Sequence, residues 1–189
     1  MEIRYIPEGT MTEKLQKDVD VINKTCLSGD PDEPDEEFDI NTYEYSAPED
    51  GMFLLFDGEK AVGRAAVHKV QTSYNGQDFW LGGFGGLAVL PEYQGKGYGR
   101  KLAEAALGKS LEIGIDIACM EANVKSGITN LYQKLGFRFL GRPAYFFNHG
   151  HNEVPDNNIM ILGLNNKTLA DEILNTDHKF HYGQHLGHW

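Results

Sequence analysis

The chain has 189 residues, of which 41% are hydrophobic and 24% are charged, and its formal net charge is −11. This composition is that of an ordinary globular domain and excludes wholesale disorder. A net negative charge repels phosphate backbones, so no nucleic-acid partner is expected, whereas cations and polyamine-like molecules would be attracted. No apolar run approaches the roughly 20 residues of a membrane span, and residues 1–7 lack the pattern of a signal peptide. We therefore expect a cytoplasmic protein with no membrane partner.

The first half of the chain predicts one helix followed by antiparallel hairpins. Apolar residues recur at helical spacing over 12–26, after Thr12, which can cap that helix. An acidic stretch over 30–50 contains no Lys or Arg and is typical of a solvated loop. Strands are then predicted at 52–56, 61–74 and 79–89, joined by Asp-Gly and Asn-Gly turn signals. The last of these strands contains four glycines, which indicate a bulge or the close approach of a ligand to the backbone.

The second half predicts alternating helices and strands. The pattern favours helices at 97–113 and 126–135, the second closed by Gly136, and an amphipathic segment at 168–174. Buried strands are expected at 115–122, 137–140 and 159–164. This order of elements indicates an α+β fold with a mixed sheet. We expect a single domain over 1–189, in which 165–189 form a C-terminal tail that completes the substrate side.

The cysteines and histidines give no sign of a metal centre. Cys26 and Cys119 match neither a metal site nor a disulfide framework, and we interpret both as free thiols. Four histidines lie between His178 and His188, but glycines interrupt any helix that could align them and no cysteine lies among them. We expect them to pack as part of a closing C-terminal segment, with no metal.

The segment 87–102 carries the chemistry. A strand ends at Val89, a turn follows with three alternating glycines, and a helix then begins with unpaired backbone N–H groups at its N-terminus. Those groups and the helix dipole favour an anion such as a phosphate, and glycines let the backbone come close to it. Arg100 and Lys101 add positive charge, as does Lys96 if it points toward the turn. A P-loop would need Ser or Thr after its lysine, and a Rossmann turn needs a parallel strand–helix–strand unit, and neither fits here.

Two motifs resemble those of the GNAT N-acetyltransferases. Gln94-Gly-Lys-Gly-Tyr-Gly99 is similar to the Gln/Arg-x-x-Gly-x-Gly/Ala motif, and Asn130-Leu-Tyr-Gln-Lys-Leu-Gly-Phe137 is similar to a later helix end of that family. The resemblance implies the GNAT fold, a mixed and mostly antiparallel seven-stranded sheet with flanking helices, in which acetyl-CoA lies where the fourth and fifth strands part. A narrower resemblance, to aminoglycoside 2′-N-acetyltransferases, covers 51–102, the Pro155-Asp156 turn and a C-terminus ending in Trp189.

The resemblance also implies roles for individual residues. The expected acetyl-CoA-binding residues are Leu87, Ala88 and Val89 along the acyl arm, Gln94, Gly95, Lys96, Gly97, Tyr98, Gly99 and Arg100 at the pyrophosphate, and Asn123 near the pantetheine. Tyr132 would be the general acid that protonates the departing thiolate. Asp30, Glu37 and Asp156 fall where relatives place carboxylates that hold substrate ammonium groups.

The general base is left open. Aminoglycoside acetyltransferases use a glutamate on the fourth strand, and Gly85 occupies the matching position on the substrate side here. The replacements we consider are the C-terminal carboxylate of Trp189, Asp156 and a tail histidine. The expected partner is a small-molecule amine of the amino-sugar or aminoglycoside kind. Alternatives are a longer-chain acyltransferase, a non-catalytic acyl-CoA-binding module and protein-lysine acetylation, and a homodimer is possible because many relatives are dimers.

Overall fold

The computed structural model describes residues 1–27, 49–122, 127–147 and 152–186, and for residue 49 and residues 183–186 it describes the backbone only. The strands are β1 (Glu2–Pro7), β2 (Glu49–Asp57), β3 (Lys60–Tyr74), β4 (Gln77–Val89), β5 (Ile117–Glu121), β6 (Arg138–Phe139), β7 (Ala144–Phe147), β8 (Glu153–Asp156), β9 (Ile159–Gly163) and β10 (Phe180–Leu186). The α-helices are α1 (Glu13–Cys26), α2 (Tyr98–Glu112), α3 (Thr129–Lys134) and α4 (Lys167–Asn175), and a short 3-10 helix, η1 (Pro91–Tyr93), precedes α2.

Seven strands form one large sheet in the order β1-β2-β3-β4-β5-β9-β6. Every neighbouring pair in it is antiparallel except β4 and β5, which are parallel. A smaller sheet in the order β10-β7-β8 packs at one end, where Thr72 of β3 donates a hydrogen bond to the His181 carbonyl of β10. The α+β architecture with a mostly antiparallel seven-stranded sheet is confirmed.

Long strands β3 and β4 form the centre of the molecule and are joined by a tight turn. Asn75 and Gly76 both have positive φ, of 50° and 79°, as a two-residue hairpin turn of the favoured hand requires. Near its other end β4 contains one residue more than β3, because Arg64 pairs with Ala88 while Ala66 pairs with Gly85. The bulge predicted from the glycine-rich strand is therefore confirmed.

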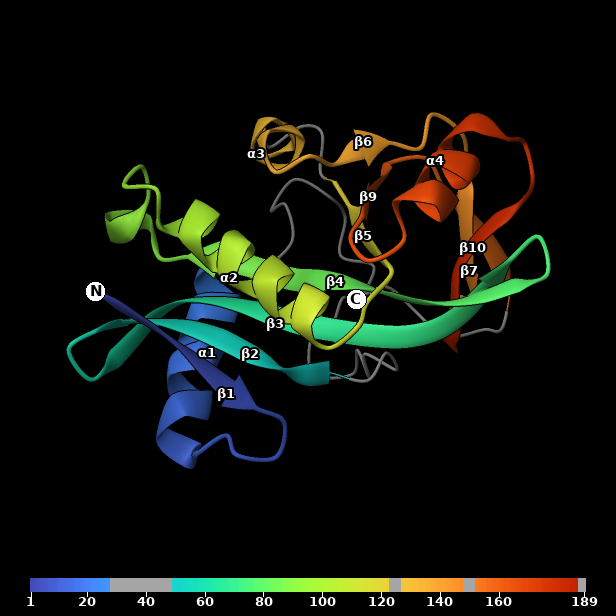
Figure 1. Ribbon diagram of the computed structural model, residues 1–189. Coiled ribbons are helices and arrows are strands. Elements are labelled where there is room, and N and C mark those ends of the chain that lie inside the picture. The colour runs from blue at the N-terminus through green and yellow to red at the C-terminus, as the bar shows by residue number, and fades with distance from the viewer. Residues whose placement is uncertain (28–48, 123–126, 148–151, 187–189) are drawn as a thin grey trace.

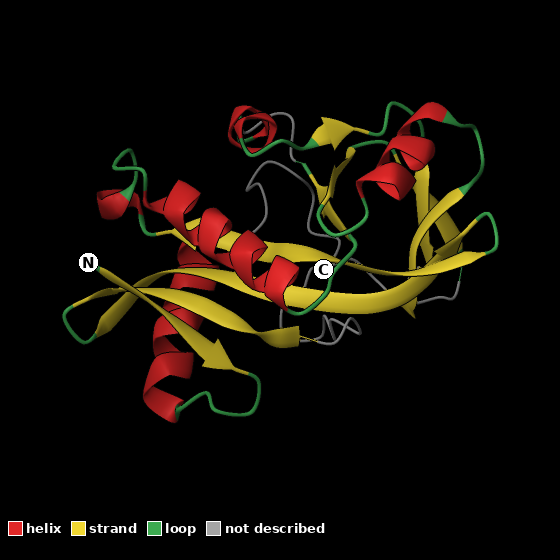
Figure 2. Cartoon of the chain, viewed as in Figure 1, coloured by secondary structure: helices red, strands yellow, loops and turns green. Residues whose placement is uncertain are grey.

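Helices α1 and α2 lie on opposite faces of the large sheet (Figures 1 and 2). The Arg64 side chain of β3 bonds Asn23 of α1, whereas a Cβ at the neighbouring Gly63 would touch Leu102 of α2. Successive residues of a strand point to opposite faces, so even-numbered residues of β3 face α1 and odd-numbered residues face α2. We call these the α1 face and the α2 face.

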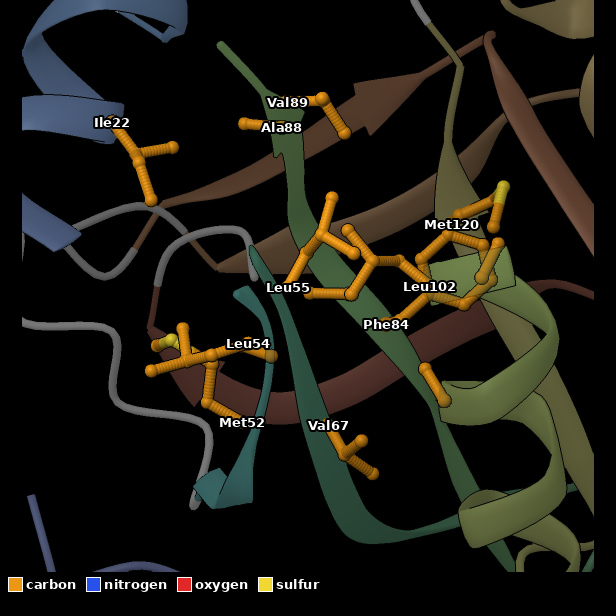
Figure 3. Close-up of a cluster of buried hydrophobic side chains, with 14 of the residues drawn as sticks. Ile22, Met52, Leu54, Leu55, Val67, Phe84, Ala88, Val89, Leu102 and Met120 are labelled. Carbon is orange, nitrogen blue, oxygen red and sulfur yellow. The ribbon is translucent and has the colours of Figure 1, made fainter. Parts of the chain in front are cut away.

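The main hydrophobic core joins these helices to the sheet. Figure 3 shows Leu55, Phe84 and Leu102 within this cluster, and all three are nearly or fully buried. Helix α1 contributes Val19 and Ile22 and is capped at its N-terminus by Thr12, whose hydroxyl accepts a hydrogen bond from the Leu15 amide. A second cluster joins α4 and the smaller sheet to the other end of β3, β4, β5 and β9.

The structure corrects the expected element list in two ways. Strand β1 opens the chain and pairs along its whole length with β2, and a strand there was not predicted. The C-terminal tail contains β10, which pairs in parallel with β7, and β7 and β8 were also missed. None of the helices in the described residues has the length and apolar character that crossing a bilayer requires.

Candidate active site

Strands β4 and β5 begin as neighbours and then part. They pair only at Leu81 with Ile117 and at Gly82 with Ala118, and no further pair joins them although β4 continues to Val89. One edge of β4 is thus left without a strand partner over its last residues in the described chain. Such an edge offers backbone N–H and C=O groups to an extended ligand, which can bind as an added strand does.

The turn between β4 and α2 presents a row of backbone donors. In the described part of the chain no acceptor is assigned to the amides of residues 95–100, whereas the next amide, of Lys101, bonds the Gly97 carbonyl. Gly97 is the N-cap of α2 and supplies no side-chain cap. Unpartnered donors at the positive end of a 15-residue helix are the features that favour an anion.

The glycines of this turn leave room for the anion. A Cβ at Gly95, Gly97 or Gly99 would meet no atom within 4 Å. Gly95 and Gly97 also have positive φ, of 72° and 79°, which other residues adopt at a cost. A row of amides without assigned partners, beside open space, is complementary to the diphosphate of a CoA molecule.

The side chains around the turn hold its shape more than they supply charge. Gln94 Nε2 donates to the Val89 carbonyl at 2.7 Å and ties the start of the turn to the end of β4. Lys96 Nζ donates to the Glu92 carbonyl at 2.8 Å, so its head is directed back along the chain. Arg100 pairs with Glu104 one turn along α2 at 2.7 Å. Lys96 and Arg100 are therefore already engaged with groups of the chain, whereas no partner is assigned to the backbone donors of the turn among the described residues.

The glycines within β4 serve the protein's own packing. A Cβ at Gly82 would lie 2.3 Å from the His68 carbonyl oxygen, and one at Gly83 would lie 2.5 Å from that of Cys119. A Cβ at Gly86 would lie 2.8 Å from the Arg64 guanidinium, which Asn23 Oδ1 also holds at 2.7 Å. At these three glycines the backbone is therefore approached by groups of β3 and β5, where the sequence had suggested a ligand, and Arg64 lies against the bulge.

Tyr132 lies beside the parting strands. It belongs to α3, is 7% exposed, and packs edge-on against Phe84 of β4 with ring centroids 5.9 Å apart. Helix α3 ends there because Phe137 N–H bonds the Tyr132 carbonyl and Gly136 N–H bonds that of Gln133, with φ of 99° at Gly136. Burial raises the pKa of Tyr132 to about 12, so its hydroxyl keeps its proton at neutral pH.

Glu121 ends β5 at the same opening and was not singled out from the sequence as a functional residue. It is the first exposed residue of that strand. Partial loss of hydration and, secondly, the Asp156 carboxylate raise the pKa of Glu121. Burial and the same carboxylate also raise the pKa of Tyr182, whose hydroxyl lies 3.4 Å from Asp156. The sequence did not mark Glu121 because its titratable neighbours Asp156 and Tyr182 come from strands that were not predicted.

The other predicted residues fall in three groups. Ala88 and Val89 are buried at the end of β4, and Gly85 is buried on the same strand. Asp156 is 7% exposed and accepts the Asn158 N–H at 2.8 Å, so it lies inside the molecule at the edge of the small sheet. The residues that lie outside the described part of the chain are Asp30, Glu37, Asn123 and Trp189.

The large sheet with its parted strands, and the glycine turn that opens α2, define the class of acyl-CoA-binding transferases. The acetyltransferase (GNAT) family profile matches residues 18–137, and the chain belongs to that family. No protein of curated function matches the sequence.

Solved structures show the same fold. The GNAT family N-acetyltransferase YhbS from Escherichia coli, in complex with CoA, has a TM-score of 0.63 at 19% identity, over 96% of this chain and 88% of that one. PH1933 from Pyrococcus horikoshii OT3 has a TM-score of 0.58 at 25% identity, over 86% and 98% of the two chains. The GCN5-related N-acetyltransferase from Kribbella flavida has a TM-score of 0.55 at 22% identity, over 75% of this chain but only 34% of that longer one.

Proposed function

We propose that the protein transfers an acetyl group from acetyl-CoA to a primary amine of a small cationic acceptor, of the amino-sugar or polyamine kind. One observation carries the donor half of this proposal. A row of unpartnered amides over residues 95–100 faces open space, at the end of a strand whose edge is unpaired. This combination suits an extended ligand that ends in a diphosphate.

The chain's own residues would bind and orient the donor. The amides of 95–100 hold the diphosphate, and the free edge of β4 over 87–89 offers backbone groups to the acyl arm. A backbone N–H directed at the thioester oxygen stabilises the charge that forms on it, and removing one such donor costs about 3–4 kcal/mol in other enzymes. Gln94 positions the turn through its bond to Val89, so strand and turn act as one rigid unit.

Tyr132 would return a proton to the leaving sulfur. Its hydroxyl has no hydrogen-bond partner assigned among the described residues, and it packs against Phe84, which lies on β4 where the strands part. Because burial raises its pKa to about 12, the Tyr132 hydroxyl stays protonated across the neutral pH range and can donate that proton. A thiolate needs only modest help to leave, so a weak acid is sufficient.

The acceptor class rests on charge. The net charge of −11 attracts cations to the molecule as a whole. Glu121, at the opening between β4 and β5, adds a carboxylate at the place where an amine would have to approach. Asp156, buried behind it, deepens the negative potential there.

Two measurements test the proposal. Calorimetric titration with acetyl-CoA should show one site, and release of free thiol should follow the addition of an amine drawn from glucosamine, spermidine, an aminoglycoside and a peptide with a free N-terminus. Binding without thiol release would favour a non-catalytic acyl-CoA-binding module. Faster release with a long-chain acyl-CoA than with acetyl-CoA would favour transfer of longer chains, and absence of binding would contradict the proposal altogether.

A further inference from the structure

We infer that Glu121 is the group that accepts the proton of the attacking amine, and that it replaces, from the neighbouring strand, the carboxylate that Gly85 lacks. This inference rests on the proposed function.

The strand register sets Glu121 opposite Gly85. Strands β4 and β5 are parallel and pair at Leu81 with Ile117 and at Gly82 with Ala118. The same offset, continued along both strands, brings Glu121 to the level of Gly85. The strands have parted by then, so the two residues lie across the opening, farther apart than the roughly 4.8 Å between paired strands.

Both positions belong to the same face of the sheet. Gly85 pairs with Ala66, an even-numbered residue of β3, and therefore lies on the α1 face. Leu81 pairs with Val70 and with Ile117, which puts Ile117 on that face too, and Glu121 follows it by four residues. A carboxylate at the end of β5 can thus extend into the same region between the strands that a side chain at position 85 would enter.

Asp156, a buried acid of the smaller sheet, is brought near Glu121 by the sheet register, because Glu121 pairs with Ile159, three residues after Asp156 in the chain. Asp156 of β8 is held by the Asn158 N–H at 2.8 Å and lies 3.4 Å from the Tyr182 hydroxyl of β10. Two carboxylates near each other resist joint ionisation, so the exposed one gains affinity for a proton. The titratable groups brought to this place are Asp156 from β8, Tyr182 from β10 and Cys119 from β5. Asp156 acts through Glu121 and is a positioning residue.

The proposed step conserves protons and electron pairs. The lone pair of the neutral amine forms the N–C bond to the acyl carbon, and the C–S bond breaks with its electron pair leaving on sulfur. The nitrogen gives one proton to the Glu121 carboxylate, directly or through one water, and the thiolate takes one from the Tyr132 hydroxyl. Protonated Glu121 then returns its proton through solvent to the Tyr132 phenolate, so the products are the amide and the free thiol.

The first arm of the test compares two glutamine variants. Glu121→Gln should lower kcat about 100-fold or more, which is the usual contribution of a general base. Its affinity for acetyl-CoA by calorimetry should stay within twofold of wild type. Glu112→Gln is the control, because Glu112 is an exposed glutamate at the end of α2 that pairs only with Lys109 among the described residues. It should leave both quantities unchanged.

The second arm of the test measures the pKa of the Glu121 carboxyl group directly. Carbon-13 NMR should show the pKa of Glu121 above its ordinary value, and Asp156→Asn, which keeps an acceptor for the Asn158 N–H, should lower it. Glu121 works as the deprotonated base, so activity is lost as pH falls through its pKa. The acid limb of kcat/KM should therefore move to lower pH in Asp156→Asn by the same amount as the carboxyl pKa.

The outcomes distinguish this inference from the proposed function on which it rests. An undiminished kcat in Glu121→Gln would overturn the inference. So would an acid limb of the kcat/KM profile that stays in place while the carboxyl pKa moves. Neither result would contradict the proposed transferase function. A wild-type protein that fails to bind acetyl-CoA, or binds it and acetylates none of the amines, would overturn both.

Discussion

Gly97 and Gly76 form a matched pair for testing the anion site. Both have φ of 79°, and a Cβ at either would meet no atom within 4 Å. Gly97 is the N-cap of α2 in the turn after β4, and Gly76 lies in the hairpin turn before β4, at the opposite end of the strand. Alanine at either position should cost the folded state the same conformational strain, about 1–2 kcal/mol for a left-handed residue.

Only the Gly97 variant should lose affinity for CoA. Relaxation of its backbone would turn a neighbouring amide away from the diphosphate, and the new methyl group would occupy the open space. Loss of one hydrogen bond to a charged group costs about 1.5–3 kcal/mol, which corresponds to a roughly 10- to 100-fold weaker Kd. Gly97→Ala should therefore bind CoA at least tenfold more weakly than wild type, while Gly76→Ala binds it normally.

The assay pairs chemical denaturation with isothermal calorimetry on the same protein samples. Denaturation should give equal losses of stability for the two variants, which removes strain as an explanation of any difference in binding. If Gly97→Ala bound CoA as tightly as Gly76→Ala, or if both lost affinity equally, the assignment of the diphosphate to this turn would be wrong.

Three further perturbations address the donor site and the proton transfers. Gly99 and Gly108 both lie in α2 without positive φ and beside open space, so Gly99→Val should weaken CoA binding by tenfold or more and Gly108→Val should not, as calorimetry would show; equal affinities would exclude the first turn of α2 from the site. Tyr132→Phe should lower kcat at least tenfold without changing acetyl-CoA affinity, and a steady-state assay in which turnover is unchanged would remove Tyr132 from catalysis. Deleting Trp189 should leave turnover within twofold because Glu121 accepts the proton, and a large loss of turnover would return that role to the C-terminal carboxylate.

Local signals in the sequence were sufficient for the centre of the fold. The Asn75-Gly76 turn, the glycines of β4 and the Gly136 helix end each require a particular backbone conformation, and the structure contains all three. The glycine turn before α2 was equally readable, because alternating glycines between a strand and a helix have few other uses. For the same reason the strand, the glycine turn and the helix that follows it could be predicted from the sequence, while the binding of an anion there stays a prediction.

The smaller sheet could not be predicted in this way. Strand β10 contains a glycine and two histidines, β8 contains a proline, and neither shows a clear alternation of apolar and polar residues. These strands depend on partners distant in sequence, since Phe180 pairs with Ala144 and Ala144 with Asp156. This pairing brings Asp156 close to Tyr182, and that contact could not be read from the sequence.

The partners of the lysine and arginine side chains at the turn also could not be predicted from the sequence. Lys96 and Arg100 were expected to contribute charge at the turn, but each has a closer partner in the chain, the Glu92 carbonyl and the Glu104 carboxylate. Exposed pairs of this kind are worth at most about 1 kcal/mol, so a phosphate could still compete for Arg100. The backbone donors, in contrast, have no assigned competitor among the described residues.

Titration of the wild-type protein with acetyl-CoA tests the central claim most directly. A ligand at 100 times its Kd stabilises the folded state by about 2.7 kcal/mol, which for a domain of this size raises Tm by roughly 5–10 °C. We predict a rise of that size together with a single calorimetric site whose affinity falls at least tenfold in Gly97→Ala. An unchanged Tm and no heat of binding at millimolar acetyl-CoA would contradict the account.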